Sequence, residues 1–363
     1  MLGSVDSKTR KEGEEGNLSR KTITLLGVLA ALATVALSGV AGKAQARTHD
    51  SEITGAGSTF VAPLVSAWTP KVQSALGIKV TYGPIGSGGG INAITNRTVD
   101  FGASDAPLTP DQFAACKGCT QIPWALSATA IAYRGDNLPN HIHVTGPVLA
   151  NIFNGRITNW SDPALKKLNK GKSLPDLKIT VIHRSDNSGT TYNLTEYLSR
   201  VSPTWKSGPG KGVAVNWPTG IGARGSAGVA AALNSAQGGI TYIDVAYTLK
   251  NHLKFFAVQN KAGTWALPGL TGIKSAAATI NRVAPDNGGI SIVNPAKTQK
   301  LAYPICTFTY VIVPKQTSKA PELKKFINWA LTKGQADGPK LLFVPIPKVV
   351  LKASLKTTAL IHS

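Results

Sequence analysis

The sequence predicts an exported α/β protein whose strands form a mostly parallel sheet in each of two domains. Short apolar, β-branched segments alternate with amphipathic helical segments along most of the chain, a pattern typical of parallel sheets whose strands are connected by helices. Polar, glycine-rich turns repeatedly join the end of an expected strand to the start of an expected helix. The length of 363 residues is sufficient for two domains that each bury a core.

The first 46 residues have the composition of a secretory signal. Ser19-Arg20-Lys21 is basic, Ile23–Val40 is an almost uncharged apolar run, and Ala44-Gln45-Ala46 is a small-x-small site. We therefore expect cleavage after Ala46. The alternative is a retained membrane anchor, because the apolar run approaches the length of a spanning helix. No cysteine lies near the site, so an N-terminal lipid anchor of the bacterial lipoprotein kind is not expected.

The mature chain contains recognisable strands and helices in alternation. Strand patterns are apolar and β-branched, whereas helical patterns place apolar residues three or four positions apart. Strands are expected over Ser51–Thr54, Ile78–Ile85, Asp100–Ala103, Gln121–Trp124, Thr129–Tyr133, Ile179–His183, Gly239–Ile243 and Thr307–Val313. Helices are expected over Phe60–Leu76, Gly88–Asn96, Thr109–Cys116, Val148–Phe153, Thr190–Arg200, Ala227–Ser235 and Pro321–Thr332. The pattern between Phe256 and Thr307 is mixed.

The charge of the chain is strongly positive. The first 46 residues contribute six basic and four acidic side chains, so +19 of the formal +21 belongs to the remainder. The lysines are scattered and carry no nucleic-acid-binding motif, so we expect no nucleic-acid partner. Two interpretations stay open: a general field that concentrates anions, or adaptation of an exported surface to its medium.

The three cysteines fit an oxidising compartment only in part. Cys116 and Cys119 form a C-x-x-C pair, for which a disulfide, a redox pair and half of a zinc site are all open. A zinc site needs further ligands, and the nearest histidines, His141 and His143, stand in another segment. We favour a disulfide. Cys306 lies in an apolar strand pattern and is expected to be a buried small side chain.

Four polar turns share one format: a strand end, small residues, a hydroxyl or charged side chain, and a helix start. They lie at Gly55–Phe60, Gly86–Gly90, Asp100–Leu108 and Arg184–Thr190. Helix N-termini leave backbone N–H groups without partners and favour negative charge. In an open α/β sheet, ligands bind at the carboxyl ends of the strands. Each turn alone also fits a simple cap or hinge, but the four together predict an anion site.

The sequences and order of these turns resemble the phosphate-binding proteins of bacterial ABC transporters. The matching motifs are Thr-Gly-Ala-Gly-Ser-Thr-Phe (54 to 60), Ile-Gly-Ser-Gly-Gly-Gly (85 to 90), Val-Asp-Phe-Gly-Ala-Ser-Asp-Ala-Pro-Leu (99 to 108) and Arg-Ser-Asp-Asn-Ser-Gly-Thr (184 to 190). Similarity extends over nearly all of the mature chain. The resemblance implies a two-domain periplasmic-binding-protein (type II) fold with hinge-linked lobes and the ligand in the interdomain cleft.

The resemblance also implies which residues hold the phosphate, without a metal or cofactor. The implied ligands are Thr59, Phe60, Ser87 and Asp105 from the first domain, and Arg184, Ser188, Gly189 and Thr190 from the second. Asp105 would accept a proton from the ligand and so reject proton-free sulfate. The planar fork of Arg184 suits a tetrahedral oxyanion. Asp186 is expected either to orient Arg184 from outside the ligand shell or to cap its own turn.

The expected organisation is a leader over residues 1–46, a discontinuous first domain over 47–132 and 257–363, and a second domain over 133–256. The expected function is that of the periplasmic subunit of a phosphate importer, monomeric until it docks on the membrane permease, which works with ATPase subunits. No nucleophile with a base and no metal-binding motif is visible, so we expect no enzyme activity. A signalling or adhesive role at the cell surface stays open.

Overall fold

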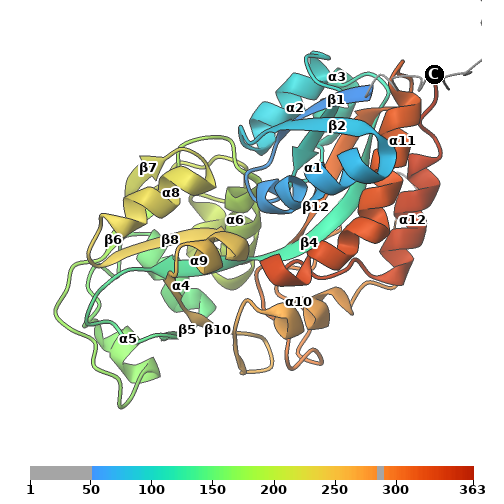
Figure 1. Cartoon of the computed structure of the whole chain (residues 1–363). Helices are drawn as coiled ribbons and strands as arrows, with labels where there is room; N and C mark the ends of the chain where they lie inside the picture. Colours follow the sequence, from blue (N-terminus) through green and yellow to red (C-terminus); the bar gives the residue numbers. More distant parts are fainter. Residues whose placement is uncertain (1–50, 284–289) are drawn as a thin grey trace, which may run out of the picture. The chain divides into compact units, whose positions relative to one another are not determined.

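The computed structural model describes residues 51–283 and 290–363, and the expected leader over residues 1–46 lies outside this part of the chain. All described elements belong to one compact unit, Thr48–Ser363. The first elements alternate strictly (Figure 1). They are β1 (Ser51–Gly57), α1 (Ala62–Leu76), β2 (Ile78–Gly83), α2 (Ser87–Thr95), β3 (Phe101–Ser104), α3 (Pro110–Ala115) and β4 (Cys119–Tyr133).

The middle of the chain adds short strands and helices around a second set of parallel strands. Its elements are β5 (His143–Val144), α4 (Gly146–Phe153), α5 (Pro163–Leu168), β6 (Thr180–Arg184), α6 (Gly189–Val201), α7 (Pro203–Ser207), β7 (Ile221–Ala223), α8 (Gly225–Asn234), β8 (Gly239–Asp244), α9 (Val245–Lys250) and β9 (Lys254–Phe255). β10 (Ala257–Gln259), β11 (Trp265–Ala266) and α10 (Leu270–Ala277) follow. The last elements are β12 (Cys306–Pro314), α11 (Ala320–Leu331), two short 3-10 helices (Lys333–Asp337 and Pro339–Leu341) and α12 (Lys348–Thr358).

Most of the described strands form one mixed sheet with two parallel parts. Its order is β2-β1-β3-β12-β4-β8-β6-β7, and β9 pairs with β4 outside this path. β1 is parallel to β2 and β3, and β6 is parallel to β7 and β8. β12 and β4 run antiparallel to their neighbours. Within each parallel part the strands run in the same direction, so their carboxyl ends lie at the same edge of the sheet.

β4 connects the two parts of the sheet and differs from the expectation. Gln121–Trp124 and Thr129–Tyr133 are predicted as two strands, but the structure has one strand that is buried along its whole length. Its first part pairs with β12 and its last five residues pair with β8. Pro123 faces a register shift between Thr309 and Tyr310 of β12. This bulge accommodates a residue that has no N–H, so the strand continues.

The remaining expected elements are present, with ends that differ by up to three residues. α12 is missing from the expectation because its lysines and threonines weaken the apolar period of the helix. It packs on β4 and on α11. Buried aromatic rings of Trp68, Phe101, Trp124 and Phe326 fill the space between the sheet and these helices. No helix in the described ranges is both long and apolar enough to cross a bilayer.

Cys116 and Cys119 are joined by a disulfide, and Cys306 is a buried free thiol. The Arg97 guanidinium lies 3.5 and 3.4 Å from the two disulfide sulfurs and also donates to the carbonyl oxygen of Cys116. The pair therefore belongs to a local structural cluster at the end of α2. Within the described residues, no group of three or more His, Cys, Asp or Glu side chains is arranged to hold a metal ion.

Candidate anion-binding site

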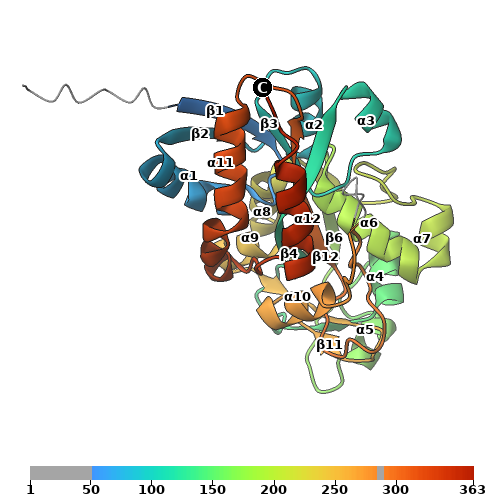
Figure 2. The ribbon, with the colours of Figure 1, turned by 90° about the vertical axis from the view of Figure 1, so that its right-hand side faces the viewer.

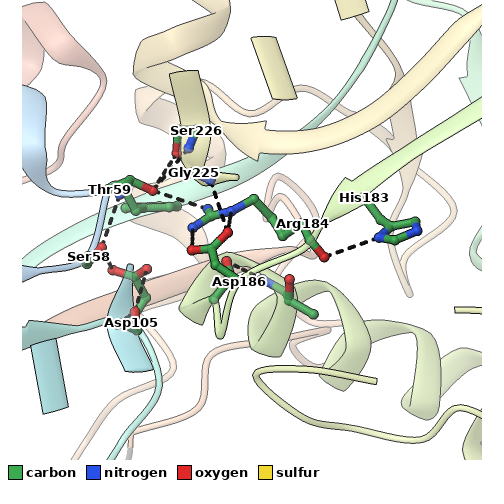
Figure 3. A network of polar contacts seen from close by, with 12 residues as sticks. Ser58, Thr59, Asp105, His183, Arg184, Asp186, Gly225 and Ser226 are labelled. Carbon is green, nitrogen blue, oxygen red and sulfur yellow. Dashed lines mark hydrogen bonds and ion pairs between the residues drawn. The ribbon is translucent and has the colours of Figure 1, made fainter. Parts of the chain in front are cut away.

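The polar turns after the parallel strands converge on one site. Ser58 and Thr59 follow β1, Ser87 follows β2, and Asp105 follows β3. Arg184 ends β6, and the turn after it leads to the N-terminus of α6. Figure 3 shows Arg184 reaching Thr59 on one side and Asp186 on the other. Residues from both parallel parts of the sheet therefore meet in one hydrogen-bonded network.

Asp105 is the buried carboxyl group of this network and is only 2% exposed. Its Oδ1 accepts hydrogen bonds from Ser58 Oγ at 2.5 Å and Thr309 Oγ1 at 2.9 Å. Its Oδ2 lies 3.4 Å from Ser87 Oγ. Burial raises the pKa of Asp105 to about 6, although these hydrogen bonds and the charge of Arg184 lower it. Asp105 therefore changes its protonation state close to neutral pH.

Arg184 is the cation of the network, and its side chain is held in one orientation. Its Nε donates to Asp186 Oδ1 at 2.7 Å, and its Nη2 donates to Asp186 Oδ2 at 2.5 Å. Burial raises the pKa of Asp186, but the hydrogen bonds and charge of Arg184 outweigh this and leave the pKa below its ordinary value. Asp186 also accepts the N–H of Gly225 at 3.0 Å. Asp186 therefore bonds both to Arg184 and to the N-terminus of α8, and its role in orienting Arg184 stays a prediction.

The two sets of turns approach each other too closely for side chains at their glycines. A Cβ atom on Gly189 would lie 2.6 Å from the Cβ of Asp105 and 2.6 Å from Ser87 Oγ. A Cβ atom on Gly88 would lie 2.3 Å from the Cβ of Asn187, and the Gly88 N–H donates to the Asn187 carbonyl oxygen at 2.9 Å. Glycine at both positions therefore permits the close contact that assembles the site.

The first turn of α6 presents polar groups that the protein leaves unused. Ser188 caps the helix, because its Oγ accepts the N–H of Thr191 at 3.2 Å. The backbone N–H groups of Gly189 and Thr190 belong to a first turn that no intrahelical carbonyl reaches. The Thr190 hydroxyl is buried and has no hydrogen-bond partner. An unpaired buried hydroxyl is costly, and this one is available to bond to a ligand.

Several residues of the network are absent from the sequence-based set. Ser58 and Thr309 bond to Asp105, and Ser226 lies 2.8 Å from the Thr59 hydroxyl. The Tyr242 hydroxyl accepts the backbone N–H of Arg184 at 3.0 Å. Ser58 lies inside the first glycine-rich turn and could be found there. The others come from strands or turns with no local signal, since only the fold brings them to the site.

Asp244 is a second buried carboxyl group beside this network. It ends β8, is fully buried, and its Oδ1 accepts the N–H of Tyr247 at 3.2 Å. Its Oδ2 is buried without a hydrogen-bond partner. Burial raises the pKa of Asp244 well above its ordinary value, the hydroxyl of Ser226 lowers it, and the charge of Asp105 raises it. The site therefore holds two carboxyl groups whose pKa values burial raises.

Several known proteins with related sequences are named phosphate-binding proteins. Residues 40–333 match the family model described as a PBP superfamily domain. The phosphate-binding protein PstS of Xylella fastidiosa (strain Temecula1) is 39% identical over 310 residues, which cover 84% of each chain. The corresponding protein of Haemophilus influenzae is 35% identical and covers 85% of this chain and 93% of its own. This chain belongs to the PstS family.

Solved structures agree with the PstS family at the level of fold. A phosphate-binding protein from Stenotrophomonas maltophilia superposes with a TM-score of 0.65 at 18% identity, covering 84% of this chain and 93% of its own. A phosphate ABC transporter substrate-binding protein from Clostridium perfringens, solved with bound phosphate, has a TM-score of 0.59 at 18% identity, over 82% and 100% of the two chains. The PstS family therefore has the two-lobed periplasmic-binding-protein fold expected from the sequence.

All eight residues that the sequence predicts as ligands of the PstS family lie in these converging turns. Arg184 contacts Thr59 directly, and Gly189 packs against Asp105 and Ser87. Two predicted donors have partners within the protein: the Phe60 N–H donates to Ser58 Oγ at 3.1 Å, and the Ser188 N–H donates to the Val213 carbonyl oxygen at 2.8 Å. The site as it stands offers hydroxyl groups, helix N–H groups and one guanidinium to an anion.

Proposed function

We propose that this chain binds inorganic phosphate between its two lobes and delivers it to the permease of an ABC importer. The observation that carries the proposal is the meeting of a buried cation, Arg184, and a buried carboxyl group, Asp105, at the N-terminus of α6. The cation and the helix attract an oxyanion. The carboxylate accepts an anion only if that anion carries a proton. Hydrogen phosphate meets both conditions, and sulfate at neutral pH does not.

The proposed ligands are those that the family resemblance implies, with two refinements from the hydrogen bonds described above. Thr59, Ser87, Ser188 and Thr190 donate their hydroxyl groups, and Gly189 donates its N–H. Ser188 acts through its hydroxyl, because its N–H is bonded to Val213. Phe60 contributes its N–H only when that group leaves Ser58 Oγ. No metal or cofactor is part of the proposal.

The lobes in this proposal are the predicted domains, residues 47–132 with 257–363 and residues 133–256. β4 passes from one parallel part of the sheet to the other. The segment before β12 leads the chain back to the first part. A bend at these two connections would separate Arg184 from Thr59 and open the site. The contacts of Gly88 and Gly189 across the site would form on closure, which couples phosphate binding to a shape that a permease can recognise.

The cellular setting follows from the same proposal. The protein acts in the periplasm after export, as a monomer that docks on the permease and ATPase subunits of the importer. The PstS family is a family of transport proteins, not of enzymes, and we propose no catalytic activity for this chain. A phosphate hydrolase would need an activated nucleophile or a metal cluster, and the described residues supply no group of metal ligands.

Titration calorimetry with phosphate and with sulfate at pH 8 tests the proposal. We expect phosphate to bind and sulfate to give no detectable heat. The variant Asp105→Asn can donate a hydrogen bond to either anion, so the preference for phosphate over sulfate is expected to narrow. Equal binding of the two anions by the unaltered protein would show that the proposed role of Asp105 is wrong. Absence of phosphate binding would refute the proposed function.

A further inference from the structure

The C-terminal part of the chain is rich in lysine and poor in acidic residues. Residues 315–363 contain nine lysines, no arginine and only two acidic residues, Glu322 and Asp337. None of these lysines takes part in the hydrogen-bond network of the phosphate site. Phosphate binding therefore does not explain this charge.

α12 carries three of these lysines along one line of its surface. Lys348, Lys352 and Lys356 are four residues apart, a spacing that places side chains on the same face of a helix. All three are exposed. Val350 and Ser354 are buried and lie on the opposite face, which packs on β4. The lysines consequently form the outermost row of the helix.

α11 packs beside α12 and carries a further exposed lysine. Lys325 is exposed, whereas the next two residues, Phe326 and Ile327, are fully buried. α11 packs against α12, and Figure 2 shows the two helices side by side. We call Lys325, Lys348, Lys352 and Lys356 the lysine face.

Among the residues that the structure describes, no ion pair neutralises the charges of the lysine face. Ion pairs of the described residues link Lys71 with Asp337, Lys79 with Glu52, and Lys211 with Glu196, but none includes a residue of the lysine face. Asp337 is therefore already engaged by a lysine of α1. The face presents four full positive charges to solvent, and neighbouring lysines raise the local potential further.

The composition of the lysine face favours a lipid surface over a protein or a nucleic acid. Protein interfaces are enriched in aromatic residues and arginine and depleted in lysine. Lysine is a flexible, strongly hydrated point charge that fits no particular acceptor geometry. An anionic bilayer demands no such geometry, and each lysine close to it strengthens binding by about fivefold.

We propose that the lysine face binds the anionic surface of a phospholipid bilayer. Attraction by several lysines at once would hold the protein against a membrane, with α11 and α12 facing the headgroups. The binding is electrostatic, so it weakens as salt shortens the range of the field from about 10 Å at 0.1 M to about 3 Å at 1 M. It does not depend on the phosphate site, because the two regions share no residue.

Vesicle sedimentation of the full chain tests the proposal. Vesicles containing phosphatidylglycerol are compared with neutral phosphatidylcholine vesicles, which measure any binding by the apolar run near the N-terminus that does not depend on charge. We expect stronger binding to the anionic vesicles, lost at about 1 M salt. No difference between the two vesicles at low salt would overturn the proposal.

Two matched triple variants separate the lysine face from net charge. Lys348→Gln, Lys352→Gln and Lys356→Gln together are expected to weaken binding to anionic vesicles by up to about 100-fold. Lys166→Gln, Lys167→Gln and Lys170→Gln remove the same charge from exposed positions in and after α5 and are expected to have a much smaller effect. Equal losses in the two variants would assign the binding to total charge and refute a specific face. Unchanged phosphate affinity in both variants shows that they are folded.

Chemical acetylation of lysine locates the bound surface directly. Mass spectrometry is expected to show protection of Lys325, Lys348, Lys352 and Lys356 by anionic vesicles, while Lys166 and Lys167 stay reactive. Protection of the lysine face by soluble polyglutamate but not by vesicles would reject the membrane and assign an acidic protein as partner. Protection of all these lysines alike would again reject a defined face.

Discussion

The guanidinium of Arg184 donates a hydrogen bond from Nη1 to the Thr59 hydroxyl, 3.1 Å away and 125 residues distant in the sequence. The same guanidinium donates to both carboxylate oxygens of Asp186. One side chain thus connects the two sets of polar turns and carries the positive charge of the site. Its planar geometry decides how the remaining donors are arranged around an anion.

Arg184→Lys is therefore expected to weaken phosphate binding although it keeps the charge. A lysine cannot reach Asp186 through two parallel hydrogen bonds and Thr59 at the same time. The loss of this hydrogen-bond geometry is expected to cost about 1.5–3 kcal/mol, which is roughly 10- to 100-fold in affinity. Calorimetry measures the change, and an affinity within threefold of the unaltered protein, roughly 0.6 kcal/mol, would contradict this role.

Gly189→Ala is expected to prevent the two sets of turns from closing. Its Cβ atom would lie 2.6 Å from the Cβ of Asp105 and 2.6 Å from Ser87 Oγ. Neither atom is the end of a long flexible side chain. We expect a loss of about 1–3 kcal/mol, or roughly 10- to 100-fold in phosphate affinity. Gly269→Ala is the matched control, since a Cβ atom there meets no atom within 4 Å. Equal affinities of the two variants would show that closure tolerates the methyl group.

Thr190→Val is expected to separate binding from stability. The Thr190 hydroxyl is buried without a partner, so its removal raises the free energy of unfolding of the ligand-free protein by about 1 kcal/mol. Phosphate affinity falls, because the ligand loses a donor. Thr191→Val is the neighbouring control: its hydroxyl lies 2.6 Å from the Tyr242 hydroxyl, and its loss lowers stability instead. Urea unfolding and calorimetry on both variants check the contrast, and a stability loss in Thr190→Val would refute it.

Asp105 is expected to make a contribution to the stability of the ligand-free protein that is lost as pH rises from about 4 to about 6. Burial raises the pKa of Asp105 to about 6, above its ordinary value of 3.8. At this residue the native state therefore binds more protons than the unfolded state in this interval, and the contribution falls with rising pH. The change is at most about 3 kcal/mol. Urea unfolding in phosphate-free buffer measures it, and an identical pH profile for Asp105→Asn would contradict the assignment.

Discrimination against sulfate is expected to follow the same ionisation. Below about pH 6 Asp105 becomes protonated and can donate a hydrogen bond to an anion without a proton. Sulfate binding should therefore appear as the pH falls from 8 to 5, whereas Asp105→Asn should bind sulfate throughout this range. Calorimetric titrations at both pH values check this. Sulfate affinity that stays constant with pH in the unaltered protein would contradict it.

The turns and most of the elements around them can be predicted from the amino-acid sequence alone. The turn from Arg184 to Thr190 follows a β-branched strand and opens an amphipathic helix, and these are local signals that need no partner. The same holds for the turns that carry Thr59, Ser87 and Asp105. Family resemblance joined the four turns into one expected site, and the structure brings them together.

The distant groups that complete that site depend on strand pairing and helix packing. Thr309 reaches Asp105 because β12 pairs with β3, and Ser226 reaches Thr59 because β7 lies beside β6. β4 continues past Pro123 because its register with β12 shifts there: Ala125 faces Thr309 and Pro123 faces Tyr310, so β4 holds one extra residue between them. α11 and α12 lie beside each other because both helices pack on the same sheet. Strand pairing and helix packing join residues that are far apart in the chain. A sequence pattern that extends over one or two turns does not predict these long-range contacts.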